Sequence, residues 1–154
     1  MTLLAIDPGT TESGWVQLDD LNRIIDHGTT DNDELIRRVY KRGADGYDLA
    51  IEMIASYGMP VGAEVFDTCV WIGRFVEAFG RPEDVDLVYR RDVKLHLCGT
   101  TRAKDANVRQ ALVDLFGPPG RKANPGPTFG VVSHAWAALG VAATVRKLER
   151  GTAT

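Results

Sequence analysis

The chain has 154 residues, of which 44% are hydrophobic and 25% charged, as in an ordinary globular protein. No apolar run approaches the roughly 18–20 residues of a membrane span, and the N-terminus lacks the basic-then-apolar pattern of an export signal. Cys69 and Cys98 have no metal-type spacing, which indicates buried thiols in a reducing compartment. We therefore expect one domain over residues 1–154, with 151–154 frayed, in the cytoplasm.

The formal net charge of −3 is unevenly distributed along the chain. Residues 90 to 122 hold eight basic and three acidic side chains, a net charge of +5, which leaves −8 for the remainder. The basic side chains are those of Arg90, Arg91, Lys94, Arg102, Lys104, Arg109, Arg121 and Lys122. A basic block on an acidic body predicts a surface that faces a polyanion beside an acidic pocket. A solvated helix face is the alternative.

Two predicted strands are apolar and each ends on an acid. Residues 3–6 are apolar at every position and precede Pro8-Gly9, which predicts a strand buried on both faces, with Asp7 as its last residue. Strands are expected next at 14–18 and 23–27, completing an antiparallel meander. A second buried strand over 48–52 ends on Glu52, and a fifth strand covers 86–89.

Helices are predicted over 31–43, 61–79, 91–98 and 104–116, and from 133 to about 150. Asp92 and Ser133 are the expected N-caps of two of them. Phe66 and Trp71 on the long helix belong either to the core or to a dimer face, and we assign Phe66 to the core. Residues 117–127, rich in Gly, Pro and basic side chains, are expected to form a flexible loop. The order of elements predicts an α/β fold in which helices cover both faces of a mixed five-stranded sheet.

The two acids are expected to meet. If the first and fourth strands are parallel neighbours, Asp7 and Glu52 project at one carboxyl edge of the sheet, where open α/β sheets place their sites. Oxygen ligands that leave waters in place suit Mg²⁺ or Mn²⁺. Two such ions about 3.5–4 Å apart can activate a water and stabilise the leaving oxygen of a phosphodiester. The alternative for Asp7 is a structural cap on the Pro-Gly turn.

Several motifs, in order, resemble one family. Ile6-Asp7-Pro8-Gly9-Thr10, with Gly14 and an aromatic following, resembles the opening motif of RuvC-type Holliday junction resolvases, and Ala50-Ile51-Glu52 resembles their second acidic motif. The segment 133–142 resembles their last helix, and 97–109 is similar to compact phage-borne members. The resemblance implies an RNase H-like nuclease fold, a homodimer, divalent metals and branched DNA as substrate, in a bacterial or phage-infected host cytoplasm.

The last helix departs from the family pattern. The family has a metal ligand there and an Asp three residues later, whereas this chain has His134 and then Ala137. The resemblance therefore implies three metal ligands, Asp7, Glu52 and His134. Either another acid substitutes, or the second metal is weakly held, or catalysis is impaired. The candidate substitutes are Glu64, Asp67 and Asp105.

Other residues have candidate roles toward DNA. Tyr57 corresponds to an aromatic that the family uses to probe the junction centre by stacking, and an ordinary surface Tyr is the alternative. Arg91, Lys94, Arg102, Arg109, Arg121 and Lys122 are expected to bind phosphates, which sets affinity without sequence choice. Lys104 is expected to do the same and to stabilise transition-state charge.

Two other functions are compatible with the sequence. The turn 7–11 is also similar to the phosphate-binding hairpin of actin-like ATPases and sugar kinases, although those proteins need two such domains. A non-catalytic junction-binding protein on the same fold is the second rival, and Ala137 supports it. Cleavage of a four-way junction with Mg²⁺ or Mn²⁺ discriminates between the rivals and the nuclease.

Overall fold

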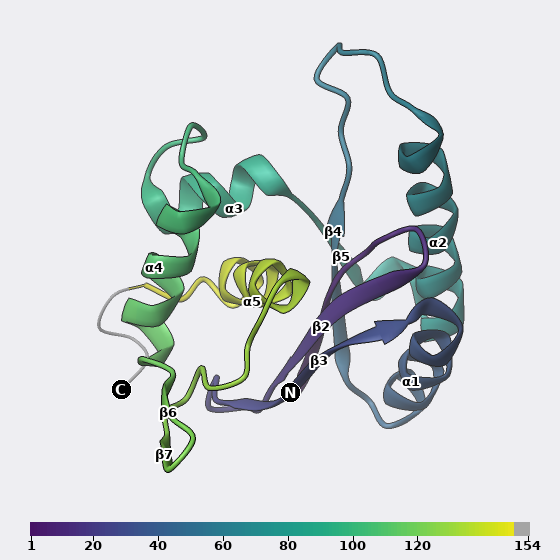
Figure 1. Cartoon of the computed structure of the whole chain (residues 1–154). Coiled ribbons are helices and arrows are strands. Elements are labelled where there is room, and N and C mark those ends of the chain that lie inside the picture. The colour runs from purple at the N-terminus through teal and green to yellow at the C-terminus, as the bar shows by residue number, and fades with distance from the viewer. Residues whose placement is uncertain (150–154) are drawn as a thin grey trace.

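The computed structural model describes residues 1–149 and contains one five-stranded sheet between two layers of helices (Figure 1). The strand order is β3-β2-β1-β4-β5. The strands are β1 Leu3–Asp7, β2 Glu12–Leu18, β3 Ile24–Asp31, β4 Asp48–Met53 and β5 Val85–Tyr89. β1, β2 and β3 form the predicted antiparallel meander, and β4 and β5 join in parallel on the other side of β1. The prediction of a mixed five-stranded sheet is confirmed.

The helices lie on both faces of this sheet. They are α1 Asn32–Ala44, α2 Ala63–Phe79, α3 Arg90–Cys98, α4 Asp105–Phe116 and α5 His134–Val145, with a short 3-10 turn at Pro82–Asp84. α1 and α2 cover one face, and α5, backed by α3 and α4, covers the other (Figure 1). Within residues 1–149 no helix combines the length and apolar character that crossing a bilayer requires.

Strand alternation decides which side chains face which layer. Side chains of a strand point alternately to the two faces of its sheet. In β1, Leu4 and Ile6 join the core under α1 and α2, whereas Leu3 and Ala5 join the core under α5. Asp7 continues the second series, so its carboxyl group points to the α5 side.

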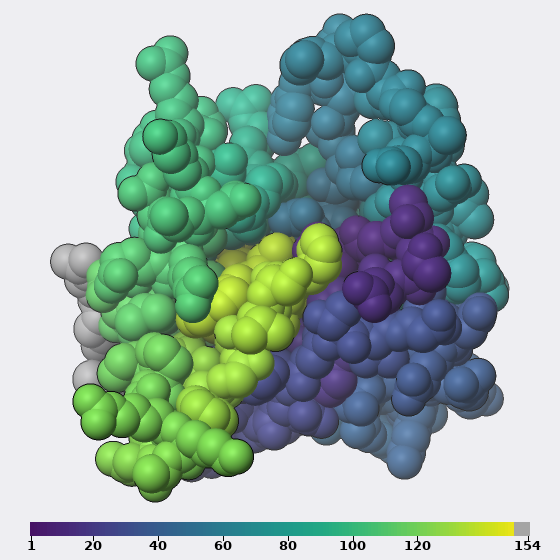
Figure 2. All heavy atoms as spheres, viewed as in Figure 1, coloured from purple at the N-terminus to yellow at the C-terminus, as the bar shows by residue number. Residues whose placement is uncertain are grey.

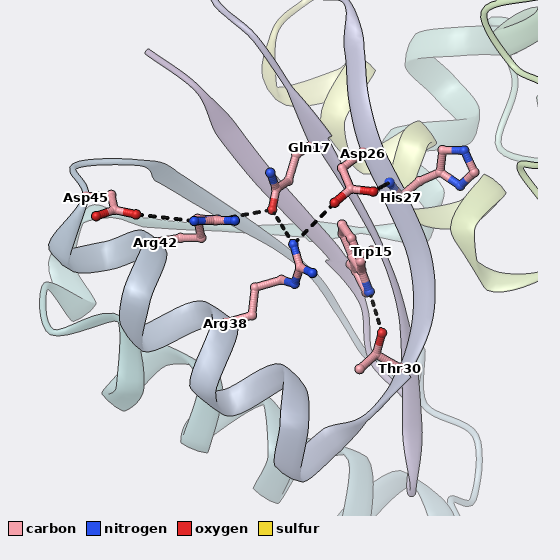
Figure 3. A network of polar contacts seen from close by, with 8 residues as sticks. All are labelled: Trp15, Gln17, Asp26, His27, Thr30, Arg38, Arg42 and Asp45. Carbon is pink, nitrogen blue, oxygen red and sulfur yellow. Dashed lines mark hydrogen bonds and ion pairs between the residues drawn. The ribbon is translucent and has the colours of Figure 1, made fainter.

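A polar network fixes α1 on the sheet (Figure 3). The buried side-chain oxygen of Gln17 accepts hydrogen bonds from Arg38 Nη1 at 2.9 Å and Arg42 Nε at 3.3 Å. The guanidinium of Arg38 lies 3.9 Å from the ring centroid of Trp15, whose Nε1 donates to Thr30 Oγ1 at 2.8 Å. These contacts tie helix and meander together, so the strand that carries Asp7 has a rigid neighbour.

The structure corrects three predictions about burial and capping. Phe66 is not in the core: it lies on the outer side of α2 and is 62% exposed. Asp92 is not an N-cap, because α3 begins at Arg90 and Asp92 lies inside its first turn. Cys69 and Cys98 are part-buried rather than fully buried.

Two corrections concern the last third of the chain. The segment 117–127 is not a simple loop, because Gly120–Arg121 (β6) and Asn124–Pro125 (β7) pair as a short antiparallel hairpin. Ser133 stands at the N-cap position of α5, but its side chain makes no capping hydrogen bond, and the helix ends at Val145. The prediction that the helix continues toward residue 150 is therefore wrong over residues 146–149. Residue 150 and the predicted fraying of 151–154 lie outside the described residues.

Candidate active site

Asp7 and Glu52 meet at the carboxyl edge of the sheet. β1 and β4 are parallel neighbours in which Ile6 pairs with Ile51. Asp7, the last residue of β1, therefore lies beside Glu52, the last residue but one of β4, although Glu52 was predicted to end its strand. Glu52 follows Ala50 by two positions, and Ala50 faces α5, so both acids point to that side. Their side chains are 11% and 17% exposed, and the two carboxyl groups are hydrogen-bonded to one another. The prediction that they lie on neighbouring strands is confirmed.

His134 is brought to Asp7 by a close approach of α5 to β2. Gly14 pairs with Asp7 in the β1–β2 ladder, and a Cβ at Gly14 would lie 2.4–2.6 Å from backbone and Cβ atoms of His134. The missing side chain lets the first residue of α5 sit directly on the strand. His134 Nδ1 consequently lies 3.0 Å from Asp7 Oδ2. Ser133, just before the helix, has φ +49° and ψ −126°, an uncommon conformation for a residue with a side chain.

Arg90 is a site residue that sequence reasoning missed. Its Nη2 donates to Asp105 Oδ1 at 2.8 Å, and its Nη1 lies 4.0 Å from Glu52 Oε1. Arg90 directly follows β5, whose carboxyl end lies beside that of β4. A polar residue at the carboxyl end of a parallel strand is placed at the edge where such sheets form their sites, and this position was the sequence feature that could have identified Arg90.

These groups line a cavity of about 670 Å³ between the sheet edge, α4 and the start of α5. The residues that line it are Asp7, Glu52, Arg90, Asp105, Ala106, Val108, Arg109, Ser133, His134, Trp136 and Ala137. Arg109 keeps its guanidinium 4.9 Å from the ring centroid of Trp136. Ala137 lies in the wall, where the family pattern has an acid. Lys104 is not among the lining residues.

Burial and mutual repulsion determine the protonation of the two acids. Burial, followed by the charge of Asp7, raises the pKa of Glu52 from 4.5 to about 8. Burial also raises the pKa of Asp7, although its hydrogen bonds to Glu52 and His134 oppose the rise. Glu52 Oε1 is buried and has no hydrogen-bond partner within residues 1–149. By contrast, the hydrogen bond from Arg90 lowers the pKa of Asp105.

The donor set at Asp7 and Glu52 fits a hard divalent cation. Two adjacent buried carboxyl groups, one with an oxygen that has no hydrogen-bond partner within residues 1–149, present oxygen ligands of the kind that Mg²⁺ and Mn²⁺ prefer. A cation there would also remove the repulsion that disfavours their ionised forms. Within residues 1–149, however, no group of three or more His, Cys, Asp or Glu side chains is arranged to hold a metal ion. The fit therefore covers the carboxyl pair alone.

The three candidate substitutes for an acid at Ala137 lie in different places. Asp105 lines the cavity of Asp7 and Glu52, but it is the ion-pair partner of Arg90. Glu64 lines a second cavity, of about 560 Å³, which also includes His134. Asp67 lines neither of these two cavities. The geometry thus favours Asp105 over the other two.

The remaining predicted DNA-binding residues lie on the surface. Tyr57 is 58% exposed in the loop after β4. Its ring centroid lies 5.8 Å from the guanidinium carbon of Arg91. It has φ +50° and is followed by Gly58 at φ +79°, in a turn closed by a hydrogen bond from Met59 N to Ser56 O. Arg91, Arg102, Lys104, Arg121 and Lys122 are exposed and Lys94 is part-buried.

Comparison with known proteins places the fold. No family model matches the chain, and no curated protein matches it in sequence. Among solved structures it is similar to RuvC of Thermus thermophilus, with a TM-score of 0.65 and 20% identity, over 96% of this chain and 94% of that one. It is also similar to the T. thermophilus RuvC in complex with a Holliday junction substrate, with a TM-score of 0.65 and 20% identity, over 94% of this chain and 92% of that one. The chain therefore has the RuvC-type RNase H-like fold.

Proposed function

We propose that the protein is a structure-selective endonuclease that resolves Holliday junctions and related branched DNA by divalent-metal-dependent phosphodiester hydrolysis. The observation that carries this proposal is the buried pair Asp7 and Glu52 in an open cavity at the sheet edge. The likeness in fold to a RuvC in complex with a Holliday junction substrate supports the choice of substrate. Such DNA lies in the cytoplasm of a bacterium or of a phage-infected host.

Asp7 and Glu52 are the residues that would hold Mg²⁺ or Mn²⁺. Asp7 lies on the central strand and contacts both Glu52 and His134, and His134, the third ligand that the resemblance implies, would help to hold a second ion. A bound cation would supply Lewis acidity toward the phosphodiester. Arg109 lines the cavity and Lys104 does not, so we transfer the predicted stabilisation of developing charge from Lys104 to Arg109.

The surface around the cavity is proposed to hold the DNA. Arg91, Lys94, Arg102 and Lys104 lie on or beside α3 and α4, which form one side of the cavity, and they supply phosphate contacts without sequence choice. Tyr57 is exposed in the loop that follows β4, five residues after Glu52. An exposed ring at this edge can stack on an unpaired base at the branch point.

A homodimer is proposed because a junction has two equivalent opposing strands and a two-fold dimer presents two equivalent cavities. Phe66 and Val70, one helical turn apart on α2, are 62% and 63% exposed and form an apolar stripe away from the cavity. This stripe is the surface that we assign to the dimer interface.

The test is cleavage of a four-way junction by the purified protein with Mg²⁺ or Mn²⁺. Asp7→Asn should abolish cleavage and keep junction binding, because the amide fills the same space without the charge that a metal needs. Removing a negative charge from the cavity should leave binding unchanged or tighter. Cleavage by Asp7→Asn at the wild-type rate would contradict the assignment.

A non-catalytic junction-binding protein is the second candidate, and the cavity wall at Ala137 favours it. The variant Ala137→Asp separates the two functions. If the wild-type protein binds junctions without cutting them and Ala137→Asp cuts, the chain is a binding protein on a nuclease scaffold. If the wild-type protein cuts and Ala137→Asp adds nothing at limiting metal, another group, with Asp105 the best placed, already serves as the ligand.

A further inference from the structure

The hairpin β6–β7 presents two basic side chains with no acidic partner. Arg121 is the last residue of β6 and Lys122 the first residue of the turn; both are exposed, and within residues 1–149 neither forms an ion pair. Arg90 differs, because Asp105 neutralises it. Figure 2 shows the hairpin in light green at the lower left margin of the molecule, where it protrudes from the body. Its two charges are therefore free to meet an anion that lies outside the cavity.

The base of the hairpin is braced, so these charges have a fixed place. Thr128 is completely buried and its Oγ1 donates to Gly117 O at 2.7 Å, while Gly126 N donates to Pro119 O at 2.8 Å. A Cβ on Gly126 would lie 1.9 Å from Pro118 O, so the two sides of the base are in close contact. Prolines at 118, 119, 125 and 127 restrict the backbone further.

Two segments connect the hairpin to the candidate active site (Figure 1). α4 begins at the cavity with Asp105 and ends at Phe116, and its 12 residues measure about 18 Å at 1.5 Å per residue. Residues 127–133 return the chain to His134. Each strand of the hairpin has two residues and adds up to about 7 Å at 3.3 Å per residue. We therefore place the basic tip about 18–25 Å from the cavity.

We propose that this hairpin is a second DNA contact, which binds the sugar-phosphate backbone of one duplex arm at a distance from the cleaved bond. At about 3.4 Å per base pair, 18–25 Å corresponds to about five to seven base pairs. The inference rests on the proposed function, since it takes the cleaved phosphate to lie at Asp7 and Glu52. The hairpin thereby orients an arm relative to the cavity without reading its sequence.

The first experiment measures the salt dependence of binding to a four-way junction with long arms, without divalent metal. Replacing both residues in R121A/K122A should flatten the log–log salt slope by about 1.8, so that wild-type affinity falls about 12-fold more than the variant's between 50 and 200 mM salt. The control R37A/K41A removes the same charge from exposed positions on α1, across the sheet, and should leave the slope unchanged. Equal slopes for R121A/K122A and wild type would overturn the inference.

The second experiment locates the contact. The cleavage site is mapped with the wild-type protein, and phosphates about five to seven base pairs away on each arm are replaced by uncharged methylphosphonates. This substrate should weaken wild-type binding as much as R121A/K122A does and should weaken the variant no further. Additive losses would overturn the placement. If the wild-type protein binds no junction, the proposed function itself is refuted. If the wild-type protein binds junctions and R121A/K122A binds them equally well, only the hairpin contact is refuted.

Discussion

Substituting Gly14 by Ala tests whether the close approach of α5 to β2 builds the site. The added Cβ would lie 2.4 Å from the carbonyl carbon of His134, whereas ordinary contacts begin at 3.4 Å. The start of α5 must therefore retreat by about 1 Å. Overpacking of this kind costs about 1–3 kcal/mol of the free energy of unfolding. A displacement of about 1 Å in a catalytic group lowers turnover about 100-fold.

The assays are denaturant unfolding and single-turnover junction cleavage, with the His134 ring resonances as a readout independent of activity. Gly73→Ala on α2 is the matched control, because no atom lies within 4 Å of its added Cβ. It should stabilise the protein by about 0.5–1 kcal/mol, since Gly disfavours a helix interior. A Gly14→Ala protein with wild-type stability and unchanged His134 resonances would refute the reasoning.

Three further predictions concern charge and assembly. Replacing Lys94, Arg102 and Lys104 together by Ala should weaken binding to all junction sequences alike and flatten the salt slope by about 2.7; a change confined to one sequence would argue for base contacts instead. In metal-free protein the pKa of Glu52 is raised from 4.5 to about 8, because the folded chain holds this side chain in its protonated form. The resulting contribution to the free energy of unfolding is complete below pH 4.5 and is lost as the pH rises to 8. Glu52→Gln should remove this loss, about 1.4 kcal/mol per pH unit at most, as measured by urea unfolding in EDTA between pH 5 and 8. Phe66→Asp should yield monomers in sedimentation analysis with an unfolding free energy within about 0.5 kcal/mol of wild type, because Phe66 is exposed; a persistent dimer would exclude the α2 stripe.

The sequence was sufficient to predict the sheet and the acid pair. An apolar run of three or four residues that leads to a carboxylate is a strong local pattern, and it occurs before both Asp7 and Glu52. Parallel pairing then follows from the intervening meander and helix, and strand alternation places both acids on one face. These features depend on short-range pattern and on topology.

The errors arose where tertiary contacts decide the outcome. Phe66 lies in an apolar stretch of α2, and helical periodicity alone does not show which side of such a helix meets the sheet. The hairpin at 120–125 depends on contacts across its base, including the buried hydroxyl of Thr128, which composition does not reveal. Arg90 was counted within a basic block, whereas its pairing with Asp105 depends on how α3 and α4 pack.

The contact between Asp7 and His134 joins positions 127 residues apart in the chain. Synthesis proceeds from the N-terminus, and the first strands can pair as soon as the meander has been made. The cavity, in contrast, cannot close until α5 has been synthesised and has packed on β1 and β2. A nascent or truncated chain that ends before residue 134 therefore contains both acids but lacks the wall opposite them. The site is therefore assembled late in synthesis and folding, and an incompletely synthesised chain lacks a complete site.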